Sequence, residues 1–406
     1  MPTAMGEIAL TPLVQVLPPP PPGRSGWPWT EGCPALPPCL PDGSPWPRIS
    51  VVTPSFNQAA FLEETIRSVL LQGYPNLEHI IVDGGSTDGS IDIIRRYGPW
   101  LACWISESDA GQTDAIRKGV RQSSGEILAW LNSDDLYCPD ALRTAGSFLA
   151  ANPGTGLLYG DCEMIDEEGC VTGRFSVRQG DLAALLGENY IAQPSAFCRR
   201  DAWEAVGGPD PALQYVMDYD LWIRQLLNGV RASYLPSVLS RFRYHAVSKS
   251  GVLSVEFGYE LLDVLDRISA SCQDPSVRRA LLEAYSRAFR TILSLHEQTS
   301  SDEHRLREDW LRVLKRWSDH LEDRREEYRP FGPLLADGYY AIGKHYCLLG
   351  RMEEGRSCLR KAREVGGKAF NRVLPARLAA SLGARSFRWY HEGCMAFSRV
   401  LTTGKS

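Results

Sequence analysis

Gly125–Asp135 reads GEILAWLNSDD, in which mostly apolar positions follow a turn residue and lead to two adjacent carboxylates. An apolar run of this length between turn signals is typical of a buried strand. Ligands of open α/β sheets bind outside the carboxyl ends of the strands, so Asp134 and Asp135 are expected at a binding edge. Two carboxylates there favour a hard cation such as Mg²⁺ or Mn²⁺. The alternative that the pair only ends the strand and caps the next helix stays open.

The residues before this stretch alternate between strand and helix patterns. Strands are predicted at Ile49–Thr53, Leu77–Val82 and Leu101–Ser106, and helices at Phe61–Gln72, Ile91–Tyr97 and Asp114–Gln122. Such alternation with short connections predicts parallel βαβ units. We therefore expect an α/β domain with a doubly wound sheet.

Length and composition indicate a soluble globular protein of two or three domains. The chain has 406 residues, 44% hydrophobic and 23% charged, and a net charge of −5, which gives no general attraction to nucleic acid. Its eleven cysteines are scattered, without a CxxC pair, as expected for reduced thiols. The sequence has neither a run of about 18 apolar residues nor a signal-peptide pattern. We expect a cytoplasmic protein and leave peripheral membrane contact open.

Polar, turn-rich loops end three of the predicted strands. They are Pro54–Asn57 (PSFN), Asp83–Ser90 (DGGSTDGS) and the NSDD of the opening stretch. The second loop lacks the GK[ST] of a phosphate-binding Walker loop, and no GxGxxG follows the first strand. These loops therefore match neither of the two common phosphate-binding motifs.

Five motifs in this order resemble those of family 2 glycosyltransferases, which have the GT-A fold, and together they cover roughly half the chain. They are Ser50–Asn57 (SVVTPSFN), Val82–Asp88 (VDGGSTD), Ser106–Gly119 (SESDAGQTDAIRKG), Gly125–Asp135 and Asp218–Arg224 (DYDLWIR). The resemblance implies a GT-A domain that binds a nucleotide-sugar donor.

The resemblance also implies roles for individual residues. It assigns nucleobase contact to Pro54, Ser55, Phe56 and Asp83, although Asp83 can equally be an Asx-turn residue with local bonds only. The other expected nucleotide-sugar contacts are Asn57, Gln112, Asp114, Asn132, Arg243 and Lys249.

The expected metal ligands are Asp134, Asp135 and His245. Asn132 replaces the first Asp of the family's Asp-x-Asp motif. Asp134 aligns with the usual ligand and Asp135 is adjacent to it, so the sequence leaves open which of them contacts Mn²⁺ or Mg²⁺ directly.

Asp218 aligns with the general-base aspartate of inverting family members. It stands near the start of a predicted helix on the same face as Trp222, which is expected to pack the helix down. The alternative is a helix cap made by Asp218 or Asp220. The chain lacks the QxxRW motif and the membrane spans of the processive synthases in the family, which favours a non-processive enzyme.

The remaining segments differ in composition. Residues 1–47 form a proline-rich leader expected to be largely disordered, with docking on the domain surface through Trp27, Trp29 and Trp46 as the alternative. Residues 48–252 form the GT-A domain. Amphipathic patterns predict a helical connector over 253–330. Residues 331–406 form a second helical region, in which Gly338–Gly366 resembles a tetratricopeptide unit that must stack on neighbouring helices. A protein partner for these all-α regions is left open.

The predicted function is inverting, metal-dependent, non-processive transfer of a sugar to an acceptor hydroxyl. The donor is expected to be a UDP-, GDP- or dTDP-sugar, and the acceptor a glycan or lipid-linked molecule in cell-surface polysaccharide or glycoconjugate synthesis. No nucleic-acid partner is expected. The alternative is a degenerate transferase domain that acts as a scaffold through its C-terminal helices. A nucleotidyltransferase is disfavoured because its Gly-rich, basic first loop is missing.

Overall fold

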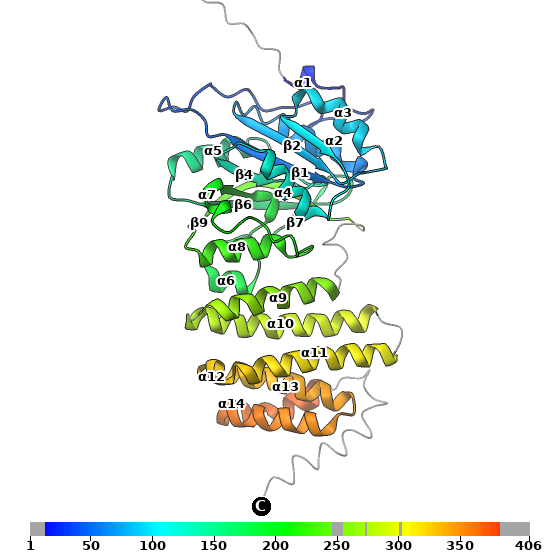
Figure 1. The fold of residues 1–406 in the computed structure, drawn as a ribbon, viewed down its shortest axis with the longest axis vertical. Coiled ribbons are helices and arrows are strands. Elements are labelled where there is room, and N and C mark those ends of the chain that lie inside the picture. Colours follow the sequence, from blue (N-terminus) through cyan, green and yellow to red (C-terminus); the bar gives the residue numbers. More distant parts are fainter. Residues whose placement is uncertain (1–12, 246–254, 273, 300–302, 382–406) are drawn as a thin grey trace, which may run out of the picture. The chain divides into compact units, whose positions relative to one another are not determined.

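The computed structural model of the protein describes residues 13–245, 255–272, 274–299 and 303–381. The chain divides into two compact units, Met1–Val252 and Leu253–Ser406, here called the first and second unit. Figure 1 shows an α/β arrangement in the first unit and only helices in the second. Each unit is described by itself.

The described part of the first unit is built on a nine-stranded mixed sheet with the order β3-β2-β1-β4-β8-β6-β9-β5, in which β7 pairs with β6. The strands are β1 Ile49–Ser55, β2 Leu77–Asp83, β3 Cys103–Ser106, β4 Ile127–Trp130, β5 Leu136–Tyr137, β6 Leu157–Ile165, β7 Val171–Arg174, β8 Ala196–Arg199 and β9 Ala232–Arg243. β1 to β4 run parallel, as the alternation of strands and helices predicts. β8 is antiparallel to both β4 and β6, and β9 is parallel to β6.

Helices cover both faces of this sheet. They are α2 Ala59–Leu70, α3 Ser90–Tyr97, α4 Gln112–Gln122, α5 Ala141–Ala151, α6 Leu182–Gly187, α7 Arg200–Glu204 and α8 Met217–Leu227. Alternate strand residues point to opposite faces. Val51 therefore packs in a core with Val69 of α2 and Leu142 of α5, whereas Ile80 and Val82 pack against Ala115 of α4.

The second half of the sheet contains a hairpin and a short turn before its inserted strand. β6 and β7 form the hairpin. The chain enters β8 through a 3-10 turn, η2 Gln193–Ser195, because Pro194 has no amide hydrogen for strand pairing. β8 starts only at Ala196.

The leader differs from the expected disordered tail, because residues 13–47 lie on the surface of the first unit. After the short helix α1, Leu13–Val16, the side chains of Leu17, Trp29 and Trp46 are buried. The buried Arg67 guanidinium of α2 donates to backbone oxygens of the leader, at Pro18, Pro28 and Trp29. Docking through the tryptophans was the alternative to a disordered tail, and it is compatible with the proline content because proline excludes regular secondary structure but not burial.

The described part of the second unit consists of helices. They are α9 Val255–Ser271, α10 Pro275–Thr299, α11 Glu303–Asp323, α12 Arg325–Tyr328, α13 Gly332–Leu348 and α14 Met352–Ser381, with a 3-10 turn η3 Arg329–Phe331 before α13. Phe289 and Trp317 stack with ring centroids 5.0 Å apart in their core. None of the described helices in either unit is long and apolar enough to cross a membrane.

Candidate active site

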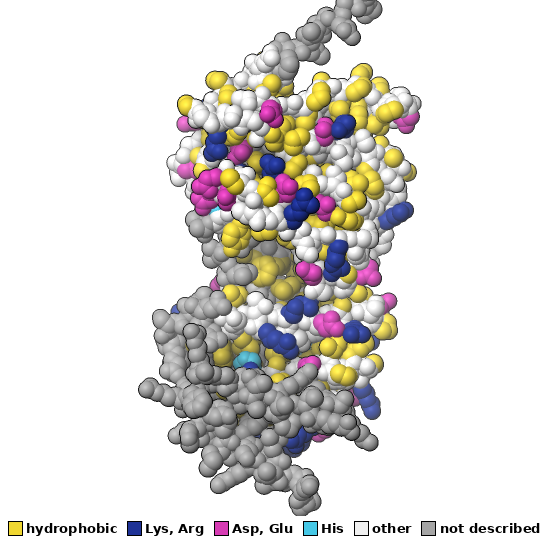
Figure 2. All heavy atoms as spheres, turned by 180° about the vertical axis from the view of Figure 1, so that it is seen from behind, with side chains coloured by type: hydrophobic (Ala, Val, Ile, Leu, Met, Phe, Trp, Pro, Cys, Tyr) yellow, Lys and Arg dark blue, Asp and Glu magenta, His cyan; other side chains and the backbone are white. Residues whose placement is uncertain are grey.

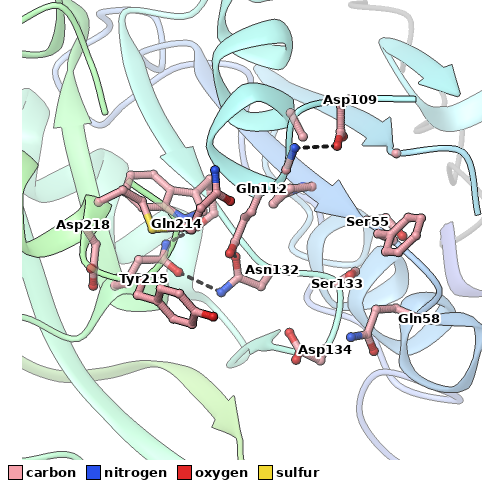
Figure 3. Close-up of a pocket in the computed structure, with 18 of the residues that line it drawn as sticks. Ser55, Gln58, Asp109, Gln112, Asn132, Ser133, Asp134, Gln214, Tyr215 and Asp218 are labelled. Atoms are coloured by element: carbon pink, nitrogen blue, oxygen red, sulfur yellow. Dashed lines mark hydrogen bonds between the residues drawn. The ribbon is translucent and has the colours of Figure 1, made fainter. Parts of the chain in front are cut away.

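A cleft of about 640 Å³ opens at the carboxyl ends of β1, β2 and β4. Figure 3 shows Ser55 and Gln58 on one side of it, Asp218, Gln214 and Tyr215 on the other, and Asn132, Ser133 and Asp134 between them. Ser55 ends β1 and Gln58 comes shortly after it, whereas Gln214 and Tyr215 precede α8 and Asp218 lies in its first turn. The third group is the turn after β4. The opening sequence stretch therefore supplies the middle of the cleft, as its position at a strand end predicts.

The structure brings only some of the predicted site residues to the cleft wall. Those that line it are Pro54, Ser55, Phe56, Gln112, Asn132, Asp134 and Asp218. Those that do not are Asn57, Asp83, Asp114, Asp135, Arg243 and His245. Lys249 lies outside the described residues.

The loop after β1 presents an aromatic ring and a buried hydroxyl to the cleft. The side chain of Phe56 is 60% exposed, which is unusual for a large apolar residue. Ser55 Oγ is buried without a hydrogen-bond partner among the described atoms. The neighbouring Asn57 instead shapes the loop, because its side-chain oxygen accepts from the Thr87 backbone amide.

Asp83 is a turn residue whose carboxylate is fully committed within the protein. Oδ2 accepts from the backbone amides of Gly85 and Ser86 and from the Ser106 hydroxyl, and Oδ1 accepts from the Ser86 hydroxyl. The side chain is buried. The Asx-turn alternative accounts for the hydrogen bonds of Asp83 in this structure, and the nucleobase contact stays a prediction.

Three amide side chains form a chain of hydrogen bonds across the cleft floor. Gln112 Nε2 donates to Asn132 Oδ1 over 2.6 Å, and Asn132 Nδ2 donates to Gln193 Oε1 over 3.1 Å. Gln193 Nε2 donates in turn to the Trp130 carbonyl. An amide at position 132 both donates and accepts here, which a carboxylate cannot do. Asn132 is thus an organising residue of the floor.

The adjacent carboxylates of Asp134 and Asp135 have different environments. The Asp134 side chain is 17% exposed, and its Oδ2 lies 3.0 Å from Nε2 of the buried His245. Asp135 is buried, and it accepts from the Arg243 backbone amide at Oδ1 and from Asn132 Nδ2 at Oδ2. Burial and the neighbouring Asp134 charge raise the pKa of Asp135. Of the two, Asp134 is the one that presents its carboxylate to the cleft.

Arg243 is a buried structural residue and not the phosphate contact expected from the sequence. Its Nε donates to the Asp134 carbonyl, Nη1 donates to the carbonyls of Asp166 and Glu167, and Nη2 pairs with Glu64 Oε2 at 2.9 Å. A guanidinium whose donors are committed in this way cannot reach a ligand in the cleft. Asp114 is also turned away from the cleft, because it pairs with Lys118.

Asp218 stands in the first turn of α8 and lines the cleft. The N-cap residue is Val216, so Asp218 is not the helix cap. Asp220 is excluded from the cleft because it pairs with Arg224 at 2.6 Å. Trp222 stacks on Trp130 of β4, with ring centroids 5.6 Å apart, and holds the helix down as expected. Burial raises the pKa of Asp218 to about 6, and nearby backbone amides lower it in part.

The sequence prediction did not select several residues that line the cleft, among them Gln58, Asp109, Gln193, Gln214 and Tyr215. Asp109 lies inside the motif Ser106–Gly119, so its position among the recognised residues was an available signal. Gln214 and Tyr215 precede α8 in an irregular segment without any motif, and only the folded chain brings them to the cleft.

Comparison with known proteins identifies the family. Residues 50–159 match the family model described as Glycosyl transferase family 2. A PGL/p-HBAD biosynthesis glycosyltransferase of Mycobacterium bovis (strain BCG / Pasteur 1173P2) is 30% identical over 206 residues, 50% of this chain and 76% of that protein. An uncharacterized glycosyltransferase of Rickettsia prowazekii (strain Madrid E) is 29% identical over 209 residues, 49% of this chain and 65% of that protein. The chain belongs to glycosyl transferase family 2 and is a glycosyltransferase.

Solved structures share the fold. S. aureus TarS 1–349 in complex with UDP-GlcNAc aligns with a TM-score of 0.56 and 17% identity, over 79% of this chain and 90% of that chain. The same TarS fragment in a second crystal structure gives a TM-score of 0.54. The expected fold class, a GT-A α/β domain followed by an all-α region, is therefore confirmed.

Proposed function

We propose that the protein transfers a sugar from a nucleotide-sugar donor to an acceptor hydroxyl by an inverting, metal-dependent and non-processive reaction. The observation that carries this proposal is the cleft lined by the exposed Phe56, the Asp134 carboxylate and the Asp218 carboxylate. Figure 3 shows Asp134 between Asp218 and Ser55, the neighbour of Phe56 in the chain. A nucleotide-sugar donor would require an aromatic ring at its nucleobase, a carboxylate for the metal at its diphosphate and a carboxylate base beside its sugar.

We assign the nucleobase to the loop after β1. The face of Phe56 is open for stacking, and the buried Ser55 hydroxyl can form a hydrogen bond with a ligand. The TarS structure with UDP-GlcNAc supports a uridine nucleotide as the first donor to test, and GDP- and dTDP-sugars are the alternatives.

The proposed metal ligands are Asp134 and His245. Among the described residues there is no cluster of three or more His, Cys, Asp or Glu side chains that could hold a metal. Two protein ligands nevertheless fit a Mg²⁺ or Mn²⁺ that takes its remaining ligands from substrate phosphate oxygens and water. Such an ion would neutralise charge on the departing nucleoside diphosphate. Asp135 is not assigned to it, because both its oxygens already accept hydrogen bonds.

Asp218 is the proposed general base. A carboxylate whose pKa is about 6 is mostly ionised at neutral pH and still accepts a proton better than an ordinary carboxylate. It would take the proton of the acceptor hydroxyl as that oxygen attacks the anomeric carbon. Gln214 and Tyr215 flank Asp218 and would contact the acceptor, a glycan or lipid-linked molecule.

The pathway and location are also proposals. The mycobacterial relative named for PGL/p-HBAD biosynthesis supports glycoconjugate or cell-surface polysaccharide synthesis. We further propose a cytoplasmic enzyme with peripheral membrane contact, which fractionation of cells would test. On the face shown in Figure 2, Lys and Arg side chains are interspersed with acidic ones over the described surface. The described part of this face therefore has no broad basic field that would attract anionic lipids, and membrane contact there would require another interaction.

Within the second unit, α13 and α14 are proposed to form a tetratricopeptide-like pair. A Cβ atom on Gly343 would lie 2.9 Å from the Gly355 carbonyl oxygen, so the two helices pack at close range where the repeat pattern requires small residues.

The proposed reaction is tested by titrating UDP, GDP and dTDP into the protein with Mn²⁺ or with a chelator, and then by assaying sugar transfer from the matching donors. Nucleotide binding that depends on Mn²⁺ is expected. The Asp218→Asn variant should bind the donor normally, and its transfer rate should fall by a factor of about 10²–10⁴. Full transfer activity in chelator or in the Asn variant would refute the proposed mechanism. If the wild type binds none of the three nucleotides, the scaffold alternative is favoured.

A further inference from the structure

The turn that carries Asp134 is held by two elements that are far apart in the sequence. Thr65 of α2 donates its hydroxyl hydrogen to the Asp135 carbonyl over 2.9 Å. Arg243, the last residue of β9, donates from its backbone amide to Asp135 Oδ1 and from Nε to the Asp134 carbonyl. Both the backbone and one carboxylate of the turn are therefore fixed from outside.

Arg243 also determines where His245 lies. The two residues are separated by one position at the end of β9, and His245 Nε2 is 3.0 Å from Asp134 Oδ2. The guanidinium lies over the Phe61 ring at 4.8 Å, and the same ring contacts His245 at 4.9 Å. A shift of Arg243 would thus change the relative position of the Asp134 carboxylate and the His245 imidazole.

Glu64 supplies the charge that keeps the Arg243 guanidinium in this place. Arg243 is fully buried, and apart from Glu64 its side chain donates to backbone carbonyls. A buried cation without a paired anion is strongly unfavourable, so the guanidinium depends on the 2.9 Å contact with Glu64. The neighbouring Glu63 instead pairs with Arg96 and accepts from the Tyr97 hydroxyl, away from the turn.

We infer that Glu64 and Arg243 form a positioning pair that holds the Asp134 carboxylate and the His245 imidazole in register for a divalent cation. Neither residue contacts the ion or the substrate. The inference rests on the proposed function, because it takes Asp134 and His245 as the metal ligands. It gives the buried Arg243 a role in the reaction different from the phosphate contact that the sequence suggested.

The test compares Glu64→Gln with Glu63→Gln, since both residues lie on α2, are buried to the same extent and pair with an arginine. Mn²⁺ is titrated calorimetrically into each protein in the presence of UDP, GDP or dTDP, whichever binds the wild type, at a temperature where the unfolding curve is on its folded baseline. Both variants should lower the melting temperature. Only Glu64→Gln should weaken Mn²⁺ binding, by about 10- to 100-fold, as is typical for groups that orient metal ligands.

A second variant, Arg243→Lys, keeps a positive charge near Glu64 but lacks the guanidinium fork that reaches the Asp134 carbonyl. It should also weaken Mn²⁺ binding. If Glu64→Gln and Arg243→Lys bind Mn²⁺ as tightly as Glu63→Gln, the positioning role is refuted while the metal site stands. If the wild type itself binds no Mn²⁺ with any of the three nucleotides, the proposed metal dependence fails and this inference fails with it.

Discussion

At the scale of single residues, the adjacent carboxylates of Asp134 and Asp135 differ in exposure and in hydrogen bonding because different groups surround them. Asp134 is open to the cleft beside His245, whereas Asp135 is enclosed by donors from Arg243 and Asn132. The partly exposed Asp134 carboxylate is the proposed ligand of the ion, and the enclosed Asp135 carboxylate stabilises the turn. Two substitutions at adjacent positions should therefore have opposite phenotypes.

Asp134→Asn should leave the melting temperature nearly unchanged and abolish Mn²⁺-dependent nucleotide binding. Asp135→Asn should cost about 1–3 kcal/mol of unfolding free energy, because its new NH₂ group faces a donor and one hydrogen bond is lost. Urea unfolding and nucleotide titration with Mn²⁺ measure the two effects. The reverse pattern would show that Asp135 is the metal ligand.

Asp218 should make both activity and stability depend on pH. Burial raises its pKa to about 6 in the native protein, whereas an Asp in the unfolded chain titrates near 4. The native state therefore holds this proton more tightly, and the unfolding free energy decreases as pH rises from about 4 to about 6. Transfer activity should change in the opposite direction, falling below about pH 6 as the general base becomes protonated.

Asp218→Asn should accordingly stabilise the protein at pH 8 by between about 1 and 3 kcal/mol, and have little effect at pH 4. Thermal unfolding of both proteins at the two pH values tests this. A loss of stability at pH 8 would show that the carboxylate contributes more as a helix-terminal anion than its burial costs.

The residues that the sequence placed correctly and incorrectly differ in one physical respect. Polarity at a strand end predicts that a side chain lies at the sheet edge, and this was correct for Ser55 and Asp134. It does not tell whether the protein itself satisfies that side chain. Asp83 lies at the same edge, but the backbone amides of Gly85 and Ser86 in its own turn occupy its carboxylate, as in the Asx-turn alternative that the sequence left open. Arg243 instead donates to carbonyls of distant segments, and such partners are visible only in the folded chain.

At the scale of elements, the cleft depends on how closely α4 packs on β1. Gly119 of α4 faces Val52, and a Cβ atom at this position would lie 2.4 Å from Val52 Cγ1. β1 continues from Val52 into Pro54 and Ser55, which line the cleft. The absence of a side chain at Gly119 therefore allows the close packing that positions the end of β1 at the cleft.

Gly119→Ala should destabilise the first unit by about 1–3 kcal/mol through overpacking, although Ala is the better helix former. Gly187→Ala in α6 is the matched control, since a Cβ atom at that position would have no atom of the described residues within 4 Å and only helix propensity changes. Thermal unfolding of the two variants provides the comparison. Equal melting temperatures would mean that α4 adjusts without moving β1.

Local patterns predicted the elements better than their order in the sheet. Apolar runs located β1, β2 and β4, and the alternation with helices correctly gave their parallel pairing. The insertion of β8 between β4 and β6 follows from contacts between segments many residues apart, for which the sequence of each strand carries no local signal. The parallel pairing of β1, β2 and β4 was therefore predictable from the sequence, whereas the position of β8 in the sheet was not.

At the scale of the whole molecule, the docked leader extends the first unit beyond the family pattern. The matched family region begins at residue 50, yet the Trp27 indole of the leader donates to the Tyr137 carbonyl and Arg67 is enclosed by leader carbonyls. These contacts reach α2 and β5, which flank the turn with Asp134. The leader therefore contributes to the stability of the part of the sheet that carries the cleft.

Two adjacent leader residues test this docking. Leu17 is 5% exposed and Val16 is 51% exposed. Leu17→Ala should lower the unfolding free energy by about 2–4 kcal/mol, whereas Val16→Ala should have an effect within about 0.5 kcal/mol. Urea unfolding measures both. Indistinguishable curves for the two variants and the wild type would mean that the leader is free in solution.

The location of Arg243 and His245 on β9 and just after it has a consequence for how the protein is made. Asp134 is synthesised more than a hundred residues before the two side chains that complete its surroundings. Chains emerge from the ribosome N-terminus first, so β1 to β4 can pair while the carboxylate turn is still incomplete. On the proposed function, a nascent chain that has not yet produced β9 therefore has the loop after β1 but lacks the Arg243 and His245 side chains beside Asp134, and competence for sugar transfer would arise only late in translation.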